Sequence, residues 1–418
     1  KNGNLYIKEA FERGASLAVV NKIDKYSNIP KQIKVKNSLK FLTEISKILR
    51  ENSKAKIIGI TGSCGKTSLK ELIGKSFQKI SKVTYSPKSF NNKYGVPLSL
   101  FNLKTKDNFG VFEIGMDKKG EIDILSKIIK PDLAIITNIS YAHAKNFNNI
   151  KQIALAKSEI IQNIKDGGII ILNSDDEFYD FHKKIAKDRN LKVFSFSMKK
   201  KNSDASLHSI KKEGRKYKVC VNIDKKKLYF YFSSTFESNL KNFLATLLVM
   251  KIYKKLDKVD KNFFFDYESP EGRGDMSKIK IDKKNIFLID ESYNSNPLSL
   301  NSAIKNFDKI NPKVSKKHLI LGDMLELGKH TKKLHLKISK YINRSSIDYI
   351  HVIGKHIIKT YTNIDKTKRG LILKKKSQII NLIKNNINNN DYLMIKGSNS
   401  TGLNKFTSNL KIGRINAL

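Results

Sequence analysis

The chain has 418 residues, of which 39% are hydrophobic, so its length exceeds one ordinary core and predicts two or three domains. Its two cysteines, Cys64 and Cys220, have neither a paired nor a metal-ligand spacing, so we expect a reducing, cytoplasmic location without structural disulfides. No apolar run approaches the length of a membrane span, and the first residues have no signal-peptide core, so no membrane insertion is expected.

The formal net charge of +43 would by itself indicate a nucleic-acid or anionic-membrane partner. The excess is mostly lysine, is spread along the chain, and comes with abundant asparagine and isoleucine and no tryptophan. This pattern is typical of an A/T-rich coding bias, so we predict no nucleic-acid partner. What remains is an electrostatic attraction for polyanionic substrates.

Residues 1–52 contain a helix end, a stop at Gly14 and a short strand at residues 17–20. This segment is too small for a complete domain, and position 1 is lysine instead of methionine. We therefore expect residues 1–52 to be the second part of an N-terminal domain. If that domain has ordinary small-domain size, roughly 60 of its residues precede position 1.

From residue 53 to 276, strand and helix patterns alternate, which predicts a mostly parallel sheet with helices on both faces. Strands are expected at 57–60, 111–114, 133–137 and 169–172, a hairpin at 217–223 and 228–232, and helices at 151–164 and 239–253, the last one amphipathic. Site residues in such a sheet lie where the strands end.

From residue 277 to 418 the alternation restarts and predicts a second doubly wound unit, with the boundary near Ser277. Its strands are expected at 286–289, 318–321, 349–353 and 392–395. The fold class is therefore α/β throughout.

The segment KIIGITGSCGKTSLKELI, residues 56–73, is a buried strand, a glycine-containing turn and a helix in direct succession. Gly62 and Gly65 allow backbone N–H groups to surround an anion, Lys66 adds a positive charge, and Thr67 offers a hydroxyl to Mg²⁺. The alternative is an ordinary glycine turn, but the strand before it and the helix after it favour a phosphate-binding loop.

Seven motifs follow one another: TGSCGKTS (61–68), SFNNKYGVP (89–97), EIGM (113–116), NISYAH (138–143), AKSEI (156–160), DESYNSNP (290–297) and GDMLELG (322–328). In this order the set resembles the Mur ligases over nearly the whole chain. The resemblance implies a three-domain architecture, with a partial N-terminal UDP-sugar-binding domain (1–52), a central ATP-binding domain (53–276) and a C-terminal Rossmann-like ligase domain (277–418).

The last two motifs favour the Mur ligase activity that adds D-alanyl-D-alanine to UDP-N-acetylmuramoyl-tripeptide in peptidoglycan precursor synthesis. Joining a carboxylate to an amine is uphill in water, so ATP first converts the carboxylate to an acyl phosphate, which the amine attacks. Lys66 is then expected at the β- and γ-phosphates, and Thr67 and Glu113 at one Mg²⁺. The alternative for Glu113 is a solvated glutamate at a strand end.

The resemblance implies a second Mg²⁺, bound by His143 and by Lys157 after carbamylation with CO₂, which turns an ammonium into an anion with two oxygens. Without the resemblance, His143 would be a surface or packing histidine and Lys157 a solvated helix lysine. The catalytic group implied is Lys66, Lys157, His143 and Arg273.

The resemblance also implies which residues contact the substrates. ATP is expected at Gly62, Ser63, Cys64, Gly65, Lys66, Thr67, Ser68, Asn242, Arg273 and Asp290. The muramoyl-peptide and the dipeptide are expected at Asn91, Asn92, Tyr293, Asn294, Lys396 and Ser398. One departure concerns the adenine contact of Asn242, because Ser238 stands where the family has a histidine before Asn239.

Two alternatives to this function stay open on the sequence. A folylpoly-γ-glutamate synthetase shares the phosphate-binding loop and the fold, although the motifs at 290–297 and 322–328 favour the Mur side. A nucleic-acid-dependent P-loop ATPase is supported only by the positive charge. We expect a monomer.

Overall fold

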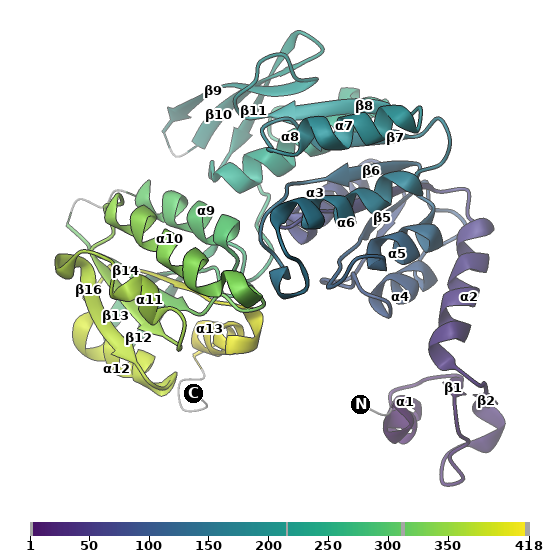
Figure 1. Ribbon diagram of the computed structural model, residues 1–418, viewed down its shortest axis with the longest axis horizontal. Helices are drawn as coiled ribbons and strands as arrows, with labels where there is room; N and C mark the ends of the chain where they lie inside the picture. Colours follow the sequence, from purple (N-terminus) through teal and green to yellow (C-terminus); the bar gives the residue numbers. More distant parts are fainter. Residues whose placement is uncertain (1–2, 215, 311–313, 414–418) are drawn as a thin grey trace.

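The computed structural model describes residues 3–214, 216–310 and 314–413. Within these residues the strands form three sheets, of two, nine and six strands. Figure 1 shows that the two large sheets with their helices make two bodies, and that the small N-terminal part extends from one of them.

The N-terminal part contains helix α1 (Ile7–Glu12) and the parallel strands β1 (Ala18–Val20) and β2 (Gln32–Lys34). Helix α2 (Ser38–Glu51) connects it to the nine-stranded sheet, and Asn37 caps the helix by accepting from Lys40 N. Near the end of α2, the buried guanidinium of Arg50 donates to Ile129 O at 2.6 Å and to Lys130 O at 3.0 Å. These bonds fix α2 to the nine-stranded sheet unit.

The nine-stranded sheet has the order β11-β10-β9-β8-β7-β6-β3-β5-β4 and is parallel from β9 to β4. Its strands are β3 (Lys56–Thr61), β4 (Val83–Tyr85), β5 (Phe109–Glu113), β6 (Leu133–Ile136), β7 (Ile169–Asn173), β8 (Lys192–Ser197), β9 (Ala205–Glu213), β10 (Lys216–Ile223) and β11 (Lys226–Phe232). The last three strands pair antiparallel. The predicted strands and the hairpin are confirmed.

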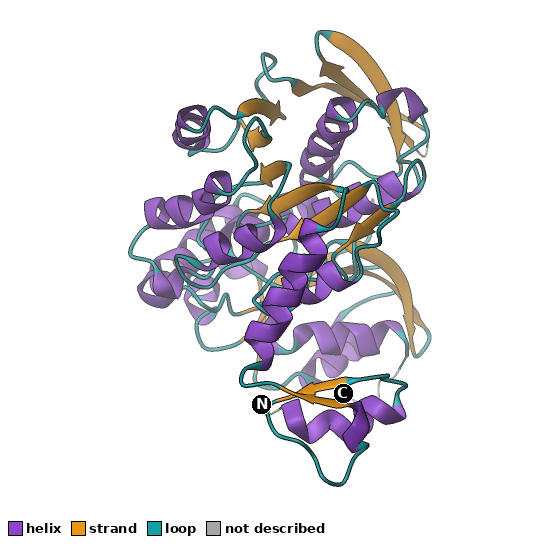
Figure 2. Ribbon diagram, turned by 90° about the vertical axis from the view of Figure 1, so that its right-hand side faces the viewer, coloured by secondary structure: helices purple, strands orange, loops and turns teal. Residues whose placement is uncertain are grey.

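Helices cover both faces of this sheet (Figures 1 and 2). They are α3 (Lys66–Gln78), α4 (Gly95–Phe101), α5 (Glu121–Ile129), α6 (Ile150–Gln162), α7 (Tyr179–Asp188) and α8 (Glu237–Ile252). Alternate residues of a strand point to opposite faces, so Ile57 packs with the core that includes α4 to α6, while Ile58 and Ile60 pack with α3 and α8.

The prediction that the helix at 239–253 is amphipathic is wrong. Every residue of α8 from Asn242 to Met250 is buried. The helix packs against α3, β8, β9 and α9, so it is enclosed on all sides and has no solvent face in this stretch.

The six-stranded sheet has the order β12-β13-β17-β14-β15-β16, in which only the pair β12 and β13 is antiparallel. Its strands are β12 (Asp275–Ile281), β13 (Lys284–Asp290), β14 (Lys317–Gly322), β15 (Tyr349–Ile353), β16 (Arg369–Leu373) and β17 (Tyr392–Lys396). Strand β12 begins before the expected boundary at Ser277, because it pairs along its whole length with β13.

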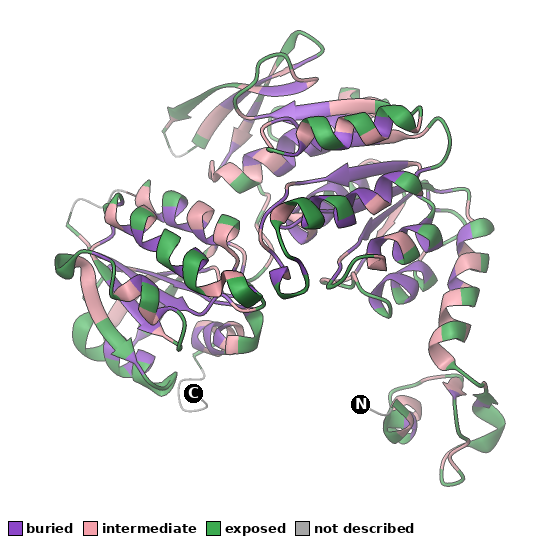
Figure 3. Cartoon of the chain, viewed as in Figure 1, coloured by how far each residue is buried: buried purple, intermediate pink, exposed green. Residues whose placement is uncertain are grey.

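The helices of this unit are α9 (Pro297–Asp308), α10 (Thr331–Asn343), α11 (Ile358–Tyr361), α12 (Ser377–Asn386) and α13 (Leu403–Lys411). The middle strands of both large sheets are buried, whereas β9 is exposed over most of its length (Figure 3). Strands β4, β8, β9, β12 and β16 were not predicted. They are short or carry exposed polar residues, so they lack the apolar run that marks a buried strand.

No helix of the described residues combines the length and the apolar character that a membrane crossing needs.

Candidate active site

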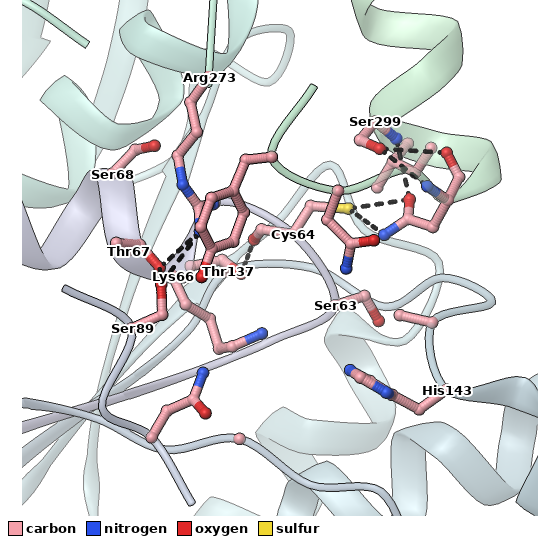
Figure 4. Close-up of a pocket in the computed structure, with 18 of the residues that line it drawn as sticks. Ser63, Cys64, Lys66, Thr67, Ser68, Ser89, Thr137, His143, Arg273 and Ser299 are labelled. Atoms are coloured by element: carbon pink, nitrogen blue, oxygen red, sulfur yellow. Dashed lines mark hydrogen bonds between the residues drawn. The ribbon is translucent and has the colours of Figure 1, made fainter. Parts of the chain in front are cut away.

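A cavity of about 940 Å³ lies between the two large sheet units. The nine-stranded unit contributes the loop after β3, the segment 89–94, the end of β5 and the loop after β6, and the six-stranded unit contributes the loops after β13, β14 and β17. Figure 4 shows the side chains of Lys66, Thr67 and Arg273 converging in this cavity. The carboxyl ends of parallel strands from both sheets therefore face one shared space.

The loop after β3 requires glycine at two positions. Gly62 has φ +145°, and a Cβ there would lie 1.9 Å from Thr137 Oγ1. Gly65, at φ +82°, is the residue before the first turn of α3. The end of β6 holds the loop from the other side, because Thr137 Oγ1 donates to Cys64 O at 2.6 Å and Cys64 N donates to Asn138 Oδ1 at 3.0 Å.

Lys66 opens helix α3 and faces the cavity. Its Nζ donates to Gly62 O at 2.9 Å, which leaves two of its three protons without a protein acceptor among the described residues. Burial lowers the pKa of Lys66, and the negative charge of Glu113 opposes this shift. The positive end of the α3 dipole points to the same place, so this end of the cavity favours a polyanion.

Thr67, Glu113 and Asn91 form a compact group of oxygen and amide side chains. Thr67 Oγ1 donates to Glu113 Oε2 at 2.7 Å, and Asn91 Nδ2 donates to Glu113 Oε1 at 2.6 Å. The carboxylate of Glu113 is 1% exposed and ends the buried strand β5. A hydroxyl and a carboxylate at this spacing fit a hard cation such as Mg²⁺.

Arg273 reaches this group from the segment before β12. Its Nη2 donates to Thr67 Oγ1 at 2.9 Å and to Ser89 Oγ at 3.3 Å, and its guanidinium lies 4.1 Å from the ring centroid of Tyr293. The preceding Gly272, at φ +73°, approaches Tyr293 closely. Arg273 therefore connects the phosphate-binding loop to the loop after β13.

His143 lines the cavity from the loop after β6 and has φ +54°. Its Nδ1 lies 2.7 Å from Glu326 Oε2 and 2.8 Å from Asp117 Oδ1. Glu326 belongs to the loop after β14, so this contact joins the two large units. The close contact with His143 lowers the pKa of Glu326.

Lys157 lies in α6, is 2% exposed, and does not line the cavity. No hydrogen bond or ion pair of its Nζ is found among the described residues. Burial, and then the nearby positive charge of Lys66, lower the pKa of Lys157 well below its usual value, while Cys64 and Glu159 oppose the shift. Burial thus favours the uncharged amine of Lys157.

The side chains expected from the C-terminal unit are mostly engaged within that unit. Asp290 is buried and does not line the cavity. Ser292 donates to its Oδ1 at 2.5 Å, and Lys411 Nζ lies 2.6 Å from its Oδ2. Lys396 lines the cavity but donates to Glu291 Oε2 at 3.1 Å and to Asn294 O at 3.0 Å.

Ser398 also has internal partners, since it donates to Ser295 O and accepts from Leu325 N. Asp290, Lys396 and Ser398 thus support loops of the six-stranded unit, while the ribose contact expected of Asp290 and the dipeptide contacts expected of Lys396 and Ser398 stay predictions. Tyr293 and Asn294 do line the cavity.

Two expected asparagines line the cavity at different places. Asn242, in α8, has its Oδ1 3.4 Å from the position of a Cβ on Gly65, so it lies against the phosphate-binding loop. Asn92 accepts from Tyr94 N and Gly95 N, which shapes the entry to α4. Ser63, Cys64 and Ser68 also line the cavity, whereas Gly62 lies behind it.

The chain matches two family models, the Mur ligase middle domain over residues 60–250 and the Mur ligase glutamate ligase domain over residues 276–399. A protein of Rickettsia prowazekii (strain Madrid E), named UDP-N-acetylmuramoyl-tripeptide--D-alanyl-D-alanine ligase, is 30% identical over 97% of this chain and 89% of its own. This chain belongs to the Mur ligase family. A protein of the same name from Buchnera aphidicola subsp. Acyrthosiphon pisum (strain APS) is 32% identical over 98% of this chain and 88% of its own.

Solved Mur ligases have the same fold. A crystal structure of MurF from Acinetobacter baumannii has a TM-score of 0.82 at 24% identity and covers 97% of this chain and 87% of its own. MurF ligase from Thermotoga maritima in complex with ADP also has a TM-score of 0.82, at 22% identity, with 98% and 91% covered. The predicted family and the α/β Mur ligase fold are confirmed.

Sequence reasoning missed several residues at this Mur ligase cavity. Asp117 directly follows the motif at 113–116, and Glu326 lies inside the motif at 322–328, so each had a signal without an assigned role. Lys70, which does not line the cavity, gave no signal. It is fully buried in α3, and its Nζ donates to Ser86 O at 2.7 Å and Lys88 O at 2.8 Å, which positions the segment that carries Asn91.

Proposed function

We propose that this Mur ligase uses ATP to join D-alanyl-D-alanine to UDP-N-acetylmuramoyl-tripeptide, the step that completes the soluble peptidoglycan precursor. The names of the Rickettsia and Buchnera relatives support the substrates. The observation that carries the proposal is the single cavity lined by both the phosphate-binding loop and the loops of the six-stranded unit. Such a cavity can bring a nucleotide, an acceptor and an amine together.

In this reaction the γ-phosphoryl group of ATP moves to the carboxylate of the tripeptide, and the amine of the dipeptide then displaces phosphate from the acyl phosphate. Lys66 and the first turn of α3 hold the nucleotide phosphates. Arg273, delivered by the segment before β12, adds a second positive charge on the same side of the cavity. These charges reduce the repulsion between the phosphates and the incoming carboxylate.

Thr67 and Glu113 would hold one Mg²⁺, since a buried carboxylate beside a hydroxyl suits a hard cation. His143 would hold a second one through a ring nitrogen. When bound, these ions neutralise charge that develops on the phosphoryl oxygens. The chain's own part is to keep the ligand atoms fixed, which Asn91 does for Glu113, while the carboxylates of Asp117 and Glu326 lie 2.8 and 2.7 Å from His143 Nδ1.

Lys157 is proposed to carry a carbamate that serves with His143 at the second ion. The lowered pKa of Lys157 supports this, because only the uncharged amine attacks CO₂ and burial favours that form. The bond formed is N–C, the proton leaves the amine, and no oxidant is required. A carbamate also supplies the negative charge that would offset nearby Lys66.

The decisive experiment is phosphate release with each acceptor and each amine, singly and together. Release that requires both UDP-N-acetylmuramoyl-tripeptide and D-alanyl-D-alanine is the expected result. Release with a folate and glutamate would favour the folylpoly-γ-glutamate synthetase activity. ATPase activity stimulated by DNA or RNA alone would instead overturn the ligase in favour of a nucleic-acid-dependent ATPase.

The enzyme is further proposed to act in the cytoplasm as a monomer, in three domains at 1–52, 53–276 and 277–418. Because Arg273 lies next to the domain boundary and stacks on Tyr293 of the loop after β13, closure of the six-stranded unit is expected to complete the site. Small-angle scattering that shows no compaction with an ATP analogue and UDP-N-acetylmuramoyl-tripeptide would count against closure.

A further inference from the structure

Lys70 is a fully buried lysine in the second turn of helix α3, beyond the phosphate-binding loop. Its Nζ donates to Glu71 Oε1, to Ser86 O at 2.7 Å and to Lys88 O at 2.8 Å. An ammonium group has three protons, so each of them has a protein acceptor. Unlike Lys66, Lys70 therefore has no donor left for a ligand.

Residues 86–91, which follow β4, contain the two carbonyl groups that Lys70 holds. A turn at 87–90 is closed by a hydrogen bond from Phe90 N to Pro87 O at 3.1 Å. Inside this turn Lys88 has φ +47°, a left-handed conformation that is unfavourable for a residue with a Cβ. Lys70 thus stabilises a turn whose backbone conformation is intrinsically costly.

The far end of the 86–91 segment faces the cavity. Ser89 Oγ lies 3.1 Å from Thr67 Oγ1 and accepts from Arg273 Nη2 at 3.3 Å (Figure 4). Asn91 Nδ2 donates to Glu113 Oε1 at 2.6 Å. Ser89 and Asn91 line the cavity, whereas Lys70 does not. The places of these two cavity side chains therefore depend on where the turn is held.

A charged side chain suits this position, because one cation serves two carbonyl groups that point to the same spot. Glu71 supplies the counter-charge, and its side chain is 16% exposed, while that of Lys70 is fully buried. A neutral side chain of similar length would leave the carbonyl groups of Ser86 and Lys88 without their donor. The turn would then lose its only bonds to Lys70 and gain none in return.

We propose that Lys70 is a positioning residue for the acceptor, which keeps the 86–91 segment in the conformation that binds UDP-N-acetylmuramoyl-tripeptide. Ordering a segment during binding costs free energy and lowers affinity, and a segment that is already ordered avoids this cost. Lys70 has no part in holding the nucleotide, because all of its protons are used within the protein. The proposal rests on the proposed ligase function.

The first test compares KM values in Lys70→Met, which keeps the length of the side chain and removes its three donors. A hydrogen bond to a charged group typically contributes a factor of about ten or more. We therefore expect KM for UDP-N-acetylmuramoyl-tripeptide to rise roughly tenfold, with KM for ATP within about twofold. An unchanged acceptor KM, or an equal rise of both KM values from general damage to α3, would overturn the proposal.

The matched control is Lys317→Met, in the six-stranded unit. Lys317 is 3% exposed, does not line the cavity, and donates to Asp308 O, Ile310 O and Ser346 Oγ. Both substitutions remove a buried ammonium with three acceptors, so both should lower the urea midpoint of unfolding. Only Lys70→Met should lose acceptor affinity, which separates positioning from stability.

The second test needs no turnover. In hydrogen–deuterium exchange of the ligand-free protein, the amides of residues 88–91 should exchange faster in Lys70→Met than in the wild type or in Lys317→Met. Calorimetry in a saturating non-hydrolysable ATP analogue should show roughly tenfold weaker binding of the acceptor to Lys70→Met alone, while the analogue binds all three proteins alike. Unchanged exchange, or faster exchange with unchanged acceptor binding, would refute the positioning role.

The two proposals can fail separately. Wild-type protein that does not bind UDP-N-acetylmuramoyl-tripeptide in the presence of the analogue would refute the ligase function, whatever the exchange rates show. Wild-type protein that binds it with the same affinity as Lys70→Met would refute the role of Lys70 alone.

Discussion

Lysines at the carboxyl edges of the two large sheets differ in how far they are engaged. At the nine-stranded sheet, Lys66 Nζ has one backbone acceptor, and Lys157 Nζ has no hydrogen-bond partner in the described part of the chain. At the six-stranded sheet, Lys396 Nζ donates to three oxygens of residues 291–294, and Lys411 contacts the carboxylates of Asp275 and Asp290. The lysines at the nine-stranded sheet keep hydrogen-bond donors free for a ligand, whereas those at the six-stranded sheet hold loops in place.

The difference indicates that the nine-stranded and six-stranded units have different roles in the site. An amine with unused donors in a cavity is free to bind phosphate or to react, because its hydrogen-bonding capacity is not satisfied by the protein. A lysine with a full set of acceptors fixes backbone and adds little to ligand binding. The nine-stranded side is therefore expected to carry the chemistry, and the six-stranded side to present rigid loops to it.

The largest effect is expected for Lys66→Ala. Loss of a preorganised charge at transferring phosphate should reduce kcat by up to about 10³-fold, or about 4 kcal/mol. Steady-state phosphate release measures it, with Lys75→Ala as the control, because Lys75 is an exposed lysine of the same helix. Wild-type turnover in Lys66→Ala would remove the phosphate-binding loop from the mechanism.

Lys396→Met should mainly affect stability. It leaves Glu291 and two carbonyls without their cation, and breaking a largely buried ion pair costs roughly 3 kcal/mol. Urea unfolding should show a lower midpoint for Lys396→Met than for Lys405→Met, which removes an exposed lysine of α13. Equal midpoints, together with a selective loss of dipeptide binding, would assign Lys396 to dipeptide binding and break the comparison.

For Lys157→Ala we expect a loss of activity on the order of 10²-fold, or about 2.7 kcal/mol, because the second metal loses an anionic ligand. Short carboxylic acids should restore part of the rate, and removal of CO₂ at alkaline pH should lower wild-type activity. Full activity in Lys157→Arg, which keeps a positive charge and forms no such carbamate, would contradict the carbamate.

The smallest effect concerns pH and the six-stranded sheet. Burial, with the neighbouring His318, lowers the pKa of His351 from 6.5 to about 3, while Leu371 N donates to its Nδ1 at 3.0 Å. Unfolded chains take up a proton below about pH 6.5 and the folded state does not, so stability falls as the pH drops from there to about 3.

At pH 5 this histidine should account for about 2 kcal/mol of lost stability relative to pH 7.5. His351→Gln, which keeps an acceptor for Leu371 N, should lose that much less in urea unfolding at the two pH values. The same loss in both proteins would assign the acid sensitivity to other groups.

Local patterns predicted much of the fold. Strands β3, β6, β7, β14 and β17 are buried on both faces, so their apolar runs stand out in the sequence. The loop after β3 was predicted from its glycines and lysine for a similar reason, because its backbone conformation and charge depend on residues that are adjacent in the chain.

Contacts between distant segments could not be predicted in the same way. The internal partners of Lys396 and Asp290 come from the loop after β13 and from α13, which the tertiary fold brings to one edge. Burial of α8 on all sides depends on packing against both sheet units, which its own periodicity does not record.

The sequence by itself determined the α/β class, the phosphate-binding loop and the family, because each depends on local periodicity or on the order of short motifs. Only the tertiary structure decided that Glu326 faces His143 and that Lys157 lies buried without a hydrogen-bond partner among the described residues. The physical reason is that hydrogen bonds and desolvation act through space over a few ångströms, between residues that lie far apart along the chain.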